Sequence, residues 1–175
     1  MRRVAIVTSA SGSGGTTVGH EIATRLDVPF HELDAIFWLP HWGRPDPDEF
    51  RARVSEIVDT EAWVIDGSYQ SWLGQLVLER ADVVVWLDPP VRVWLSRLVS
   101  RTFQRVVTRE SLWGTNRETI RGALFSRDSL LVFTARHYRS RRRTYPERFA
   151  AYTLVRLRTQ PEIDGFLSAI AARAT

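Results

Sequence analysis

The chain has 175 residues, of which 44% are hydrophobic and 25% charged, as expected for one globular domain. It contains no cysteine, which excludes a disulfide framework and thiolate metal sites, and it has no apolar run of about 18 residues that could span a membrane. The formal net charge is +4, and all 24 basic residues are arginines. That excess favours an anionic ligand, although an arginine-rich composition is also typical of GC-rich genomes. The apolar start, residues 4–7, is too short for a signal peptide, so we expect a cytoplasmic protein.

Predicted strands and helices alternate along the chain. Apolar β-rich runs predict strands at residues 3–8, 29–33, 62–65, 82–87 and 152–157. Helical spacing predicts helices at residues 16–26, 47–59, 73–80, 90–107, 130–143 and 161–170. Such alternation predicts an α/β fold in three layers, with a parallel sheet between helices. Because ligands of such sheets bind at the carboxyl ends of the strands, Asp34, Asp66 and Asp88, which end three predicted strands, should converge on one crevice.

The segment between the first strand and the first helix is rich in small residues. It reads Ser9-Ala10-Ser11-Gly12-Ser13-Gly14-Gly15-Thr16-Thr17. Small residues in this position let backbone amides surround a phosphate at the helix N-terminus, and Thr16 could bind Mg²⁺ through its hydroxyl. The usual P-loop pattern, G-x-x-x-x-G-K-[ST], is matched only at Gly14 and Thr16, since Ser9 replaces the first glycine and Gly15 the lysine. A Gly/Ser turn without a ligand is the alternative interpretation.

Four further motifs follow this loop in order. They are His31-Glu32-Leu33-Asp34-Ala35-Ile36-Phe37-Trp38, Trp63-Val64-Ile65-Asp66-Gly67-Ser68-Tyr69, Arg80-Ala81-Asp82-Val83-Val84-Val85-Trp86-Leu87-Asp88 and Val155-Arg156-Leu157-Arg158. Together with the loop, they make nearly the whole chain resemble P-loop kinases related to adenylate kinase, and in particular the bacterial "adenylate kinase-like" or "DNA topology modulation protein" group. The resemblance implies a single P-loop kinase-like domain over residues 1–175, with a nucleoside monophosphate kinase-like sheet of five strands in the order 2-3-1-4-5. It also implies a basic helical lid over approximately residues 108–145.

The resemblance also implies a site. ATP phosphates would lie over Ser11, Gly12, Ser13, Gly14, Gly15, Thr16 and Thr17, with Mg²⁺ on Thr16. Asp34 would hold or deprotonate the acceptor, Asp66 would order the Mg²⁺ waters, and Asp88 is interpreted as a helix cap. Arg97, Arg101 and Arg105 share a helix face, of which Arg101 and Arg105 are assigned to the nucleotide. In the basic cluster at 136–143, Arg139 and Arg142 are assigned to the transferring phosphoryl group.

Two departures from the resembling kinases bear on activity. Gly15 stands where these enzymes have a lysine that stabilises the phosphates, so turnover should be weakened. Asp66-Gly67 is followed by Ser68-Tyr69-Gln70 and lacks the arginine that holds AMP in adenylate kinases. Trp38, Trp42, Trp72 and Trp113 lie in predicted loops, where they line an acceptor pocket or fill gaps beneath the lid.

Three hypotheses follow. The first is a phosphotransferase that uses ATP and Mg²⁺ on a nucleotide, nucleoside or other small acceptor. The second, favoured by Gly15, is a catalytically inactive nucleotide-binding protein, and the third is a nucleic-acid-binding regulator, which ranks last because no recognition motif accompanies the basic residues. The four histidines lack metal-ligand spacing, so no structural metal is expected.

Overall fold

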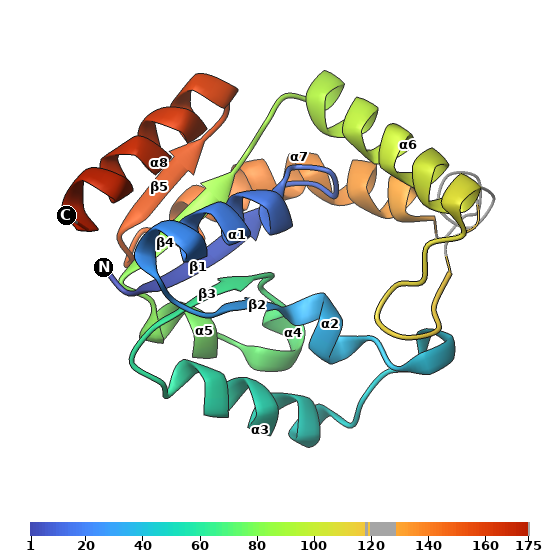
Figure 1. Cartoon of the computed structure of the whole chain (residues 1–175), viewed down its shortest axis with the longest axis horizontal. Helices are drawn as coiled ribbons and strands as arrows, with labels where there is room; N and C mark the ends of the chain where they lie inside the picture. The colour runs from blue at the N-terminus through green and yellow to red at the C-terminus, as the bar shows by residue number, and fades with distance from the viewer. Residues whose placement is uncertain (118, 120–128, 175) are drawn as a thin grey trace.

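A computed structural model describes residues 1–117, 119 and 129–174. Its centre is a five-stranded, all-parallel sheet in the order β2-β3-β1-β4-β5 (Figure 1). The strands are β1 (Arg3–Thr8), β2 (Phe30–Glu32), β3 (Trp63–Asp66), β4 (Val83–Leu87) and β5 (Leu154–Leu157). The α/β class, the parallel sheet and the strand order predicted from the sequence are therefore confirmed.

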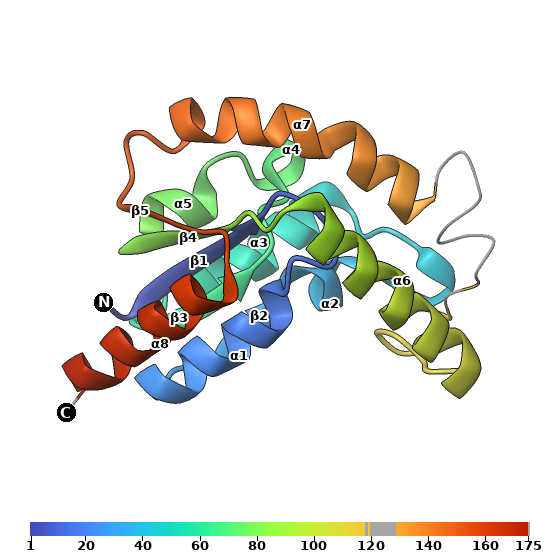
Figure 2. The same ribbon diagram turned by 90° about the horizontal axis from the view of Figure 1, so that it is seen from above.

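Helices cover both faces of the sheet, as Figure 2 shows from above. One face packs on α1 (Gly15–Leu26) and α8 (Gln160–Ala174), through Val4 and Ile6 of β1. The other face packs on α3 (Pro47–Val58), α5 (Leu76–Arg80) and α7 (Leu130–Arg148) through Ala5 and Val7. Successive side chains of β1 point to opposite faces of the sheet, and each face is covered by an apolar layer. All residues in the middle of the strand are therefore buried and apolar.

The remaining helices surround the carboxyl ends of the strands. They are α2 (Leu33–Phe37), the short 3₁₀ helix η1 (Pro40–Trp42), α4 (Gln70–Leu73) and α6 (Val91–Thr108). The predicted helix at 73–80 corresponds to α5, which begins only at Leu76. Gly74, whose positive φ of 60° ends the preceding helix α4, separates the two helices. The predicted strand at 29–33 is shorter than expected, so Asp34 lies in the first turn of α2 and not at a strand end.

The lid predicted at approximately 108–145 coincides with the end of α6, the segment after it and most of α7. Residues 118 and 120–128 of that range lie outside the described residues. Trp94 and Leu98 of α6 pack with Tyr138 of α7 and Ala10 of the loop after β1. The two long helices are therefore anchored next to that loop.

Candidate phosphate and acceptor site

The loop between β1 and α1 turns at two glycines, Gly12 and Gly14, directly before the start of α1. Gly12 and Gly14 have φ values of 85° and 94°, in the left-handed region that glycine adopts without strain. Gly12 also lets α6 approach, because a Cβ there would lie 2.5 Å from the carbonyl oxygen of Trp94. Gly14 is the N-cap residue of α1 and provides no side-chain cap, so the first amides of this helix are available to an anion.

Ser13 supplies independent support for a ligand at this loop. Its side chain is 2% exposed, and its Oγ has no hydrogen-bond partner among the described residues. A buried hydroxyl without a partner is costly in a folded protein unless a ligand or water satisfies it. A polar ligand or a water molecule bound at this loop would satisfy the Ser13 hydroxyl.

Asp66 fills the space that a side chain at position 15 would need. A Cβ built on Gly15 would lie 2.8 Å from Cγ of Asp66 and closer still to both carboxylate oxygens. Burial, followed by the charges of Asp34 and Glu32, raises the pKa of Asp66 to about 7, against the smaller effect of a hydrogen bond from Thr16. The space in which a lysine side chain at position 15 would begin is therefore not empty, because the Asp66 carboxyl group occupies it.

Thr16 joins this carboxyl group to a second one. Its Oγ1 lies 3.1 Å from Oε1 of Glu32 and 3.3 Å from Oδ2 of Asp66. No role was predicted for Glu32 from the sequence. It nevertheless stands at the end of β2, and a place at a strand end was the reason for selecting the other carboxylates. Its other oxygen accepts a hydrogen bond of 3.4 Å from Nε1 of Trp113.

The residues present fit a magnesium ion that is also bound by phosphate. One hydroxyl and two carboxylates are hard oxygen donors, and Mg²⁺ in phosphoryl-transfer sites usually takes one or two carboxylates together with water and phosphate oxygens. Across the described residues, no group of three or more His, Cys, Asp and Glu side chains could enclose a metal by itself. A magnesium ion here would thus depend on the nucleotide for its remaining ligands.

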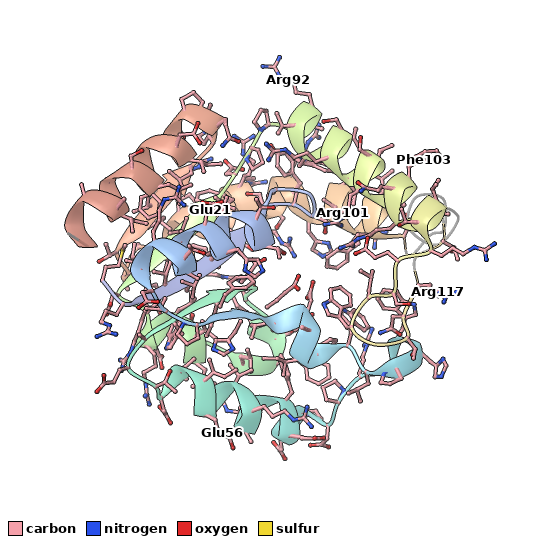
Figure 3. All side chains as sticks on the ribbon, in the orientation of Figure 1. Glu21, Glu56, Arg92, Arg101, Phe103 and Arg117 are labelled. Carbon is pink, nitrogen blue, oxygen red and sulfur yellow. The ribbon has the colours of Figure 1, made fainter. Side chains whose placement is uncertain are left out.

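Asp34 points to the same region from α2. It accepts a hydrogen bond from the hydroxyl group of Tyr69, the residue that directly precedes α4. Burial raises the pKa of Asp34, and this is opposed by the Tyr69 hydrogen bond and by the charge of Arg101. Asp34 therefore lies close enough to Asp66 and to Arg101 to interact with each electrostatically. The third carboxylate expected in this crevice, Asp88, lies instead in a separate network with Ser9 and two arginines. Figure 3 shows the labelled Arg101 on α6, facing the interior, while Arg92 of the same helix points outward.

Aromatic rings border this acidic region. Trp38, Trp42 and Trp113 form consecutive edge-on contacts with ring centroids 5.4 and 6.1 Å apart. Asn116, which is 1% exposed, fixes the segment that carries Trp113 by accepting from the Trp42 amide at 2.7 Å and donating to the Leu39 carbonyl at 3.0 Å. Trp72 packs instead on Phe37 and Phe50 in the apolar core, so it fills space beneath α2.

The arginines assigned from the sequence have different surroundings. Arg139 is exposed, and Arg105 lies 3.6 Å from Glu110, with which it forms an ion pair. Arg142 is bound to Asp88 at 3.1 Å. Two arginines of the described residues place a guanidinium group next to the loop after β1. Nη1 of Arg97 lies 3.5 Å from the Cβ position of Gly14, and Nη1 of Arg141 donates to the Ser9 carbonyl at 3.4 Å.

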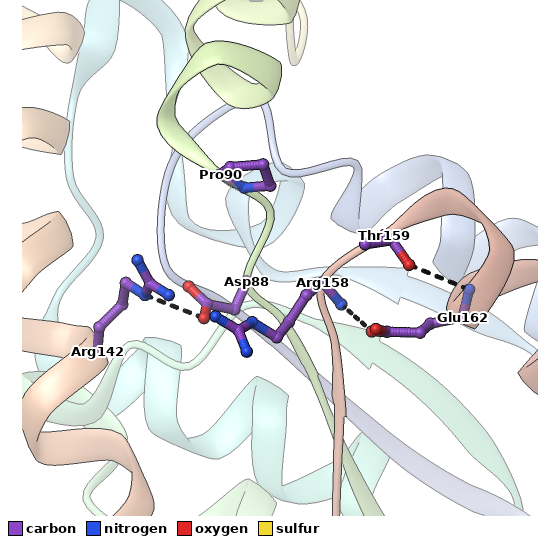
Figure 4. A pocket seen from close by; sticks show the side chains of 6 residues that line it. All are labelled: Asp88, Pro90, Arg142, Arg158, Thr159 and Glu162. Atoms are coloured by element: carbon purple, nitrogen blue, oxygen red, sulfur yellow. Dashed lines mark hydrogen bonds and ion pairs between the residues drawn. The ribbon is translucent and has the colours of Figure 1, made fainter.

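Asp88 is not the helix cap expected from the sequence. The N-cap of α6 is Pro90, and the Asp88 carboxylate is fully buried in a network of hydrogen bonds. It accepts from Oγ of Ser9 at 2.8 Å and from Nε of Arg142 and Arg156 at 3.1 and 3.0 Å. Figure 4 shows the adjoining pocket, about 220 Å³ in volume, into which Arg142 and Arg158 project from opposite sides. Ser9, which stands where the usual P-loop pattern has its first glycine, thus connects the loop through Asp88 to α7 and β5.

A second cavity, of about 210 Å³, lies beside the phosphate loop. Its walls come from the loop, the start of α6 and the start of α8, and include Ser13, Pro89, Arg97, Thr159 and Gln160. The cavity therefore continues from the buried Ser13 hydroxyl toward the sheet edge formed by β5.

Solved structures that resemble this chain include several small-molecule kinases. Shikimate kinase from Bacteroides thetaiotaomicron has a TM-score of 0.60 at 19% identity, with 98% of this chain and 97% of that chain covered. A gluconokinase from Sinorhizobium meliloti 1021 has a TM-score of 0.55 at 19% identity, covering 98% and 94%. Deoxyadenosine kinase from M. mycoides with bound dATP has a TM-score of 0.51 at 13% identity, covering 97% of each chain. These likenesses show that the fold is that of the P-loop kinases.

Sequence comparison adds one relative. An uncharacterized protein of Bacillus subtilis (strain 168), YqaC, is 29% identical over 107 residues, which span 60% of each chain. No family model matches. Within the described residues, no helix combines the length and the apolarity needed to cross a membrane.

Proposed function

We propose that this chain is a phosphotransferase that moves the terminal phosphoryl group of Mg²⁺–ATP to a hydroxyl group of a small acceptor, with release of ADP. The observation that carries the proposal is the loop at 9–17, where the uncapped start of α1 and the orphaned Ser13 hydroxyl lie next to Thr16 and its two carboxylates. The kinase folds of the structural neighbours support it.

Each group then has a role. The amides of residues 11–17 bind the phosphates, and the cavity beside Ser13 takes the nucleoside. Thr16, Glu32 and Asp66 would hold Mg²⁺, which would neutralise phosphate charge. Asp34, oriented by Tyr69, accepts the proton of the acceptor hydroxyl or positions that hydroxyl for attack.

The acceptor lies on the side of the acidic and aromatic groups. Deoxyadenosine kinase, shikimate kinase and gluconokinase bear names that indicate hydroxylated small molecules as substrates. An acceptor of this kind agrees with the absence of the AMP-binding arginine after Gly67 in the sequence.

The test has a binding stage and a turnover stage. Mg²⁺–ATP should raise the melting temperature, because a ligand at 100 times its Kd stabilises the folded state by about 2.7 kcal/mol. Release of ADP should then depend on an added acceptor from a panel of nucleosides, sugars and hydroxy acids. If no nucleotide shifts the melting temperature at millimolar concentration, the proposal is wrong.

A second function has specific support. The Asp66 carboxyl group at the lysine position adds negative charge where a kinase normally places positive charge, which favours a nucleotide-binding protein without turnover. Under this alternative, ATP binds in the first stage and no acceptor produces ADP in the second, even at high enzyme concentration.

A further inference from the structure

The two carboxylate oxygens of Glu32, in the candidate magnesium site, have different partners. Oε1 lies 3.1 Å from the hydroxyl of Thr16, and Oε2 accepts a hydrogen bond of 3.4 Å from Nε1 of Trp113. A glutamate side chain has several rotatable bonds, so a single contact leaves its carboxylate free to turn. The two contacts together fix which oxygen faces Thr16.

The charges around Glu32 oppose this orientation. Burial is the main cause that raises the pKa of both Asp34 and Asp66, and the charge of Glu32 raises both further. Because like charges repel, Glu32 without a donor on its other oxygen would turn away from Asp66 and so from Thr16. The hydrogen bond from Trp113 acts against that rotation.

Trp113 belongs to a segment distant in sequence, the turn that follows α6. Two backbone hydrogen bonds between Leu112 and Asn116, of 2.7 and 3.2 Å, close this turn. The φ of Trp113 is 43°, in the left-handed region that non-glycine residues rarely adopt. Such a conformation persists only where the surrounding structure holds it, and residues of this kind cluster at functional sites.

Asn116 holds this turn to the aromatic turn after α2. Its Oδ1 accepts from the Trp42 amide at 2.7 Å, its Nδ2 donates to the Leu39 carbonyl at 3.0 Å, and its side chain is 1% exposed. The rings of Trp42 and Trp113 add an edge-on contact, with centroids 6.1 Å apart. Since α2 leads directly from Glu32 to the aromatic turn, Asn116 fixes Trp113 relative to Glu32.

We propose that Trp113, held in place by Asn116, is a positioning residue of the magnesium site, whose indole N–H keeps Oε1 of Glu32 directed at Thr16. The inference rests on the proposed function, because it assigns a residue to the metal that accompanies the nucleotide. Partners that orient a metal ligand typically contribute about tenfold to a hundredfold to metal affinity. Trp113 acts on the metal through Glu32 and leaves the contacts between the phosphate loop and the nucleotide unchanged.

The test measures ATP binding by calorimetry on the full chain, once with a chelator and once with Mg²⁺. The ratio of the two dissociation constants is the gain due to magnesium. Trp113→Phe keeps a ring against Trp42 but has no N–H, so it should bind metal-free ATP like the parent and lose about tenfold to a hundredfold of that gain. Trp72→Phe is the matched control, because Trp72 packs on Phe37 and Phe50 and should not affect the gain.

A double-mutant cycle shows whether Trp113 acts through Glu32. In the Glu32→Ala protein, Trp113→Phe should cause no further loss of Mg²⁺–ATP affinity, whereas a merely structural role would give additive losses. Asn116→Ala, which frees the turn that carries Trp113, should also lower the gain due to magnesium. Where melting curves show that Trp113→Phe does not fold, Asn116→Ala takes its place in the comparison.

The outcomes separate this inference from the proposed function. If the parent binds Mg²⁺–ATP more tightly than ATP, and the folded variant keeps the full gain, the inference is wrong and the proposed function stands. Additive losses in the cycle also overturn it. If magnesium adds nothing to ATP binding by the parent, both the inference and the assigned magnesium site are wrong. If the parent binds ATP under neither condition, the proposed function itself fails.

Discussion

At the scale of single residues, the central feature is the pair formed by Gly15 and Asp66. The sequence alone presents Gly15 as a lost lysine. In the structure, the Asp66 carboxyl group lies where a side chain at 15 would begin, so the two positions depend on each other. Any substitution at 15 must therefore be interpreted together with the position and charge of Asp66.

Replacing Gly15 by alanine tests this dependence. We expect Gly15→Ala to lower the free energy of unfolding by about 1–3 kcal/mol, because the new methyl group displaces the Asp66 carboxyl group from Thr16. Gly165→Ala is the matched control, since no atom lies within 4 Å of its Cβ position in α8, and it should stabilise by roughly 0.5–1 kcal/mol. Equal effects of the two substitutions in denaturant titrations would contradict the close contact.

Restoring the lysine is a second test at this scale. In Gly15→Lys, the Asp66 side chain must rotate away, after which the ammonium group can pair with it and reach the β- and γ-phosphates. If the chain is a kinase weakened at this position, turnover should rise by about a hundredfold to a thousandfold, the usual value of one charge-stabilising contact in a transition state. Nucleotide binding with no gain for any acceptor would favour the inactive nucleotide-binding protein.

The raised pKa of Asp66 predicts a pH dependence of stability. Because the group takes up its proton at about pH 7 when folded and near 3.8 when unfolded, the folded state binds more protons between these values. The free energy of unfolding of the metal-free protein should therefore gain a contribution from this group as pH falls from about 7 to 4. Asp66→Asn should remove that contribution in melts recorded with a chelator. An unchanged pH profile in the variant would show that Asp66 titrates normally.

At the scale of elements, Asp88 connects four parts of the molecule. Its carboxylate joins the end of β4 to Ser9 of the loop, Arg142 of α7 and Arg156 of β5, whose guanidinium lies 4.1 Å from the centroid of the Trp86 ring. A fully buried carboxylate with two arginine partners is expensive to disrupt, since removal leaves partly buried cations without a counter-charge.

Asp88→Ala should accordingly cost about 3–5 kcal/mol of stability in denaturant unfolding. Asp59→Ala removes the partner of Arg80 in an exposed ion pair and should change stability by less than about 1 kcal/mol. Should both variants unfold at the same denaturant concentration, the buried network would have no special role in holding α7 and β5 to the loop.

At the scale of the whole molecule, the site is an assembly of segments distant in sequence. The phosphate loop follows β1, Glu32 and Asp34 come from β2 and α2, Asp66 ends β3, and Arg97 comes from α6. The parallel sheet brings these segments together because all its strands end at the same edge.

Lid motion over this edge remains a prediction. It is tested by comparing hydrogen exchange in residues 130–148 with and without Mg²⁺–ATP, and we expect slower exchange in the bound state.

The sequence by itself determined the fold class and the strand order, and it marked the Gly/Ser loop between β1 and α1 as the candidate phosphate site. Apolar runs such as Val83–Leu87 and the alternation of strand and helix are local signals, and five ordered motifs carried the resemblance that gave the order of the sheet. Small residues between β1 and α1 marked the loop even without its lysine, because the backbone conformation depends on Gly12 and Gly14.

Only the tertiary structure decided which charged groups meet at that loop. It paired Glu32 with Thr16, placed Asp66 in the space beside Gly15, bound Arg142 to Asp88 and left Arg97 next to Gly14. These contacts depend on the rotation of each helix about its axis and on side-chain rotamers, which the long-range packing of Trp94, Leu98 and Tyr138 sets. A spacing of four residues puts Arg97, Arg101 and Arg105 on one helix face, but it contains no information about what that face meets.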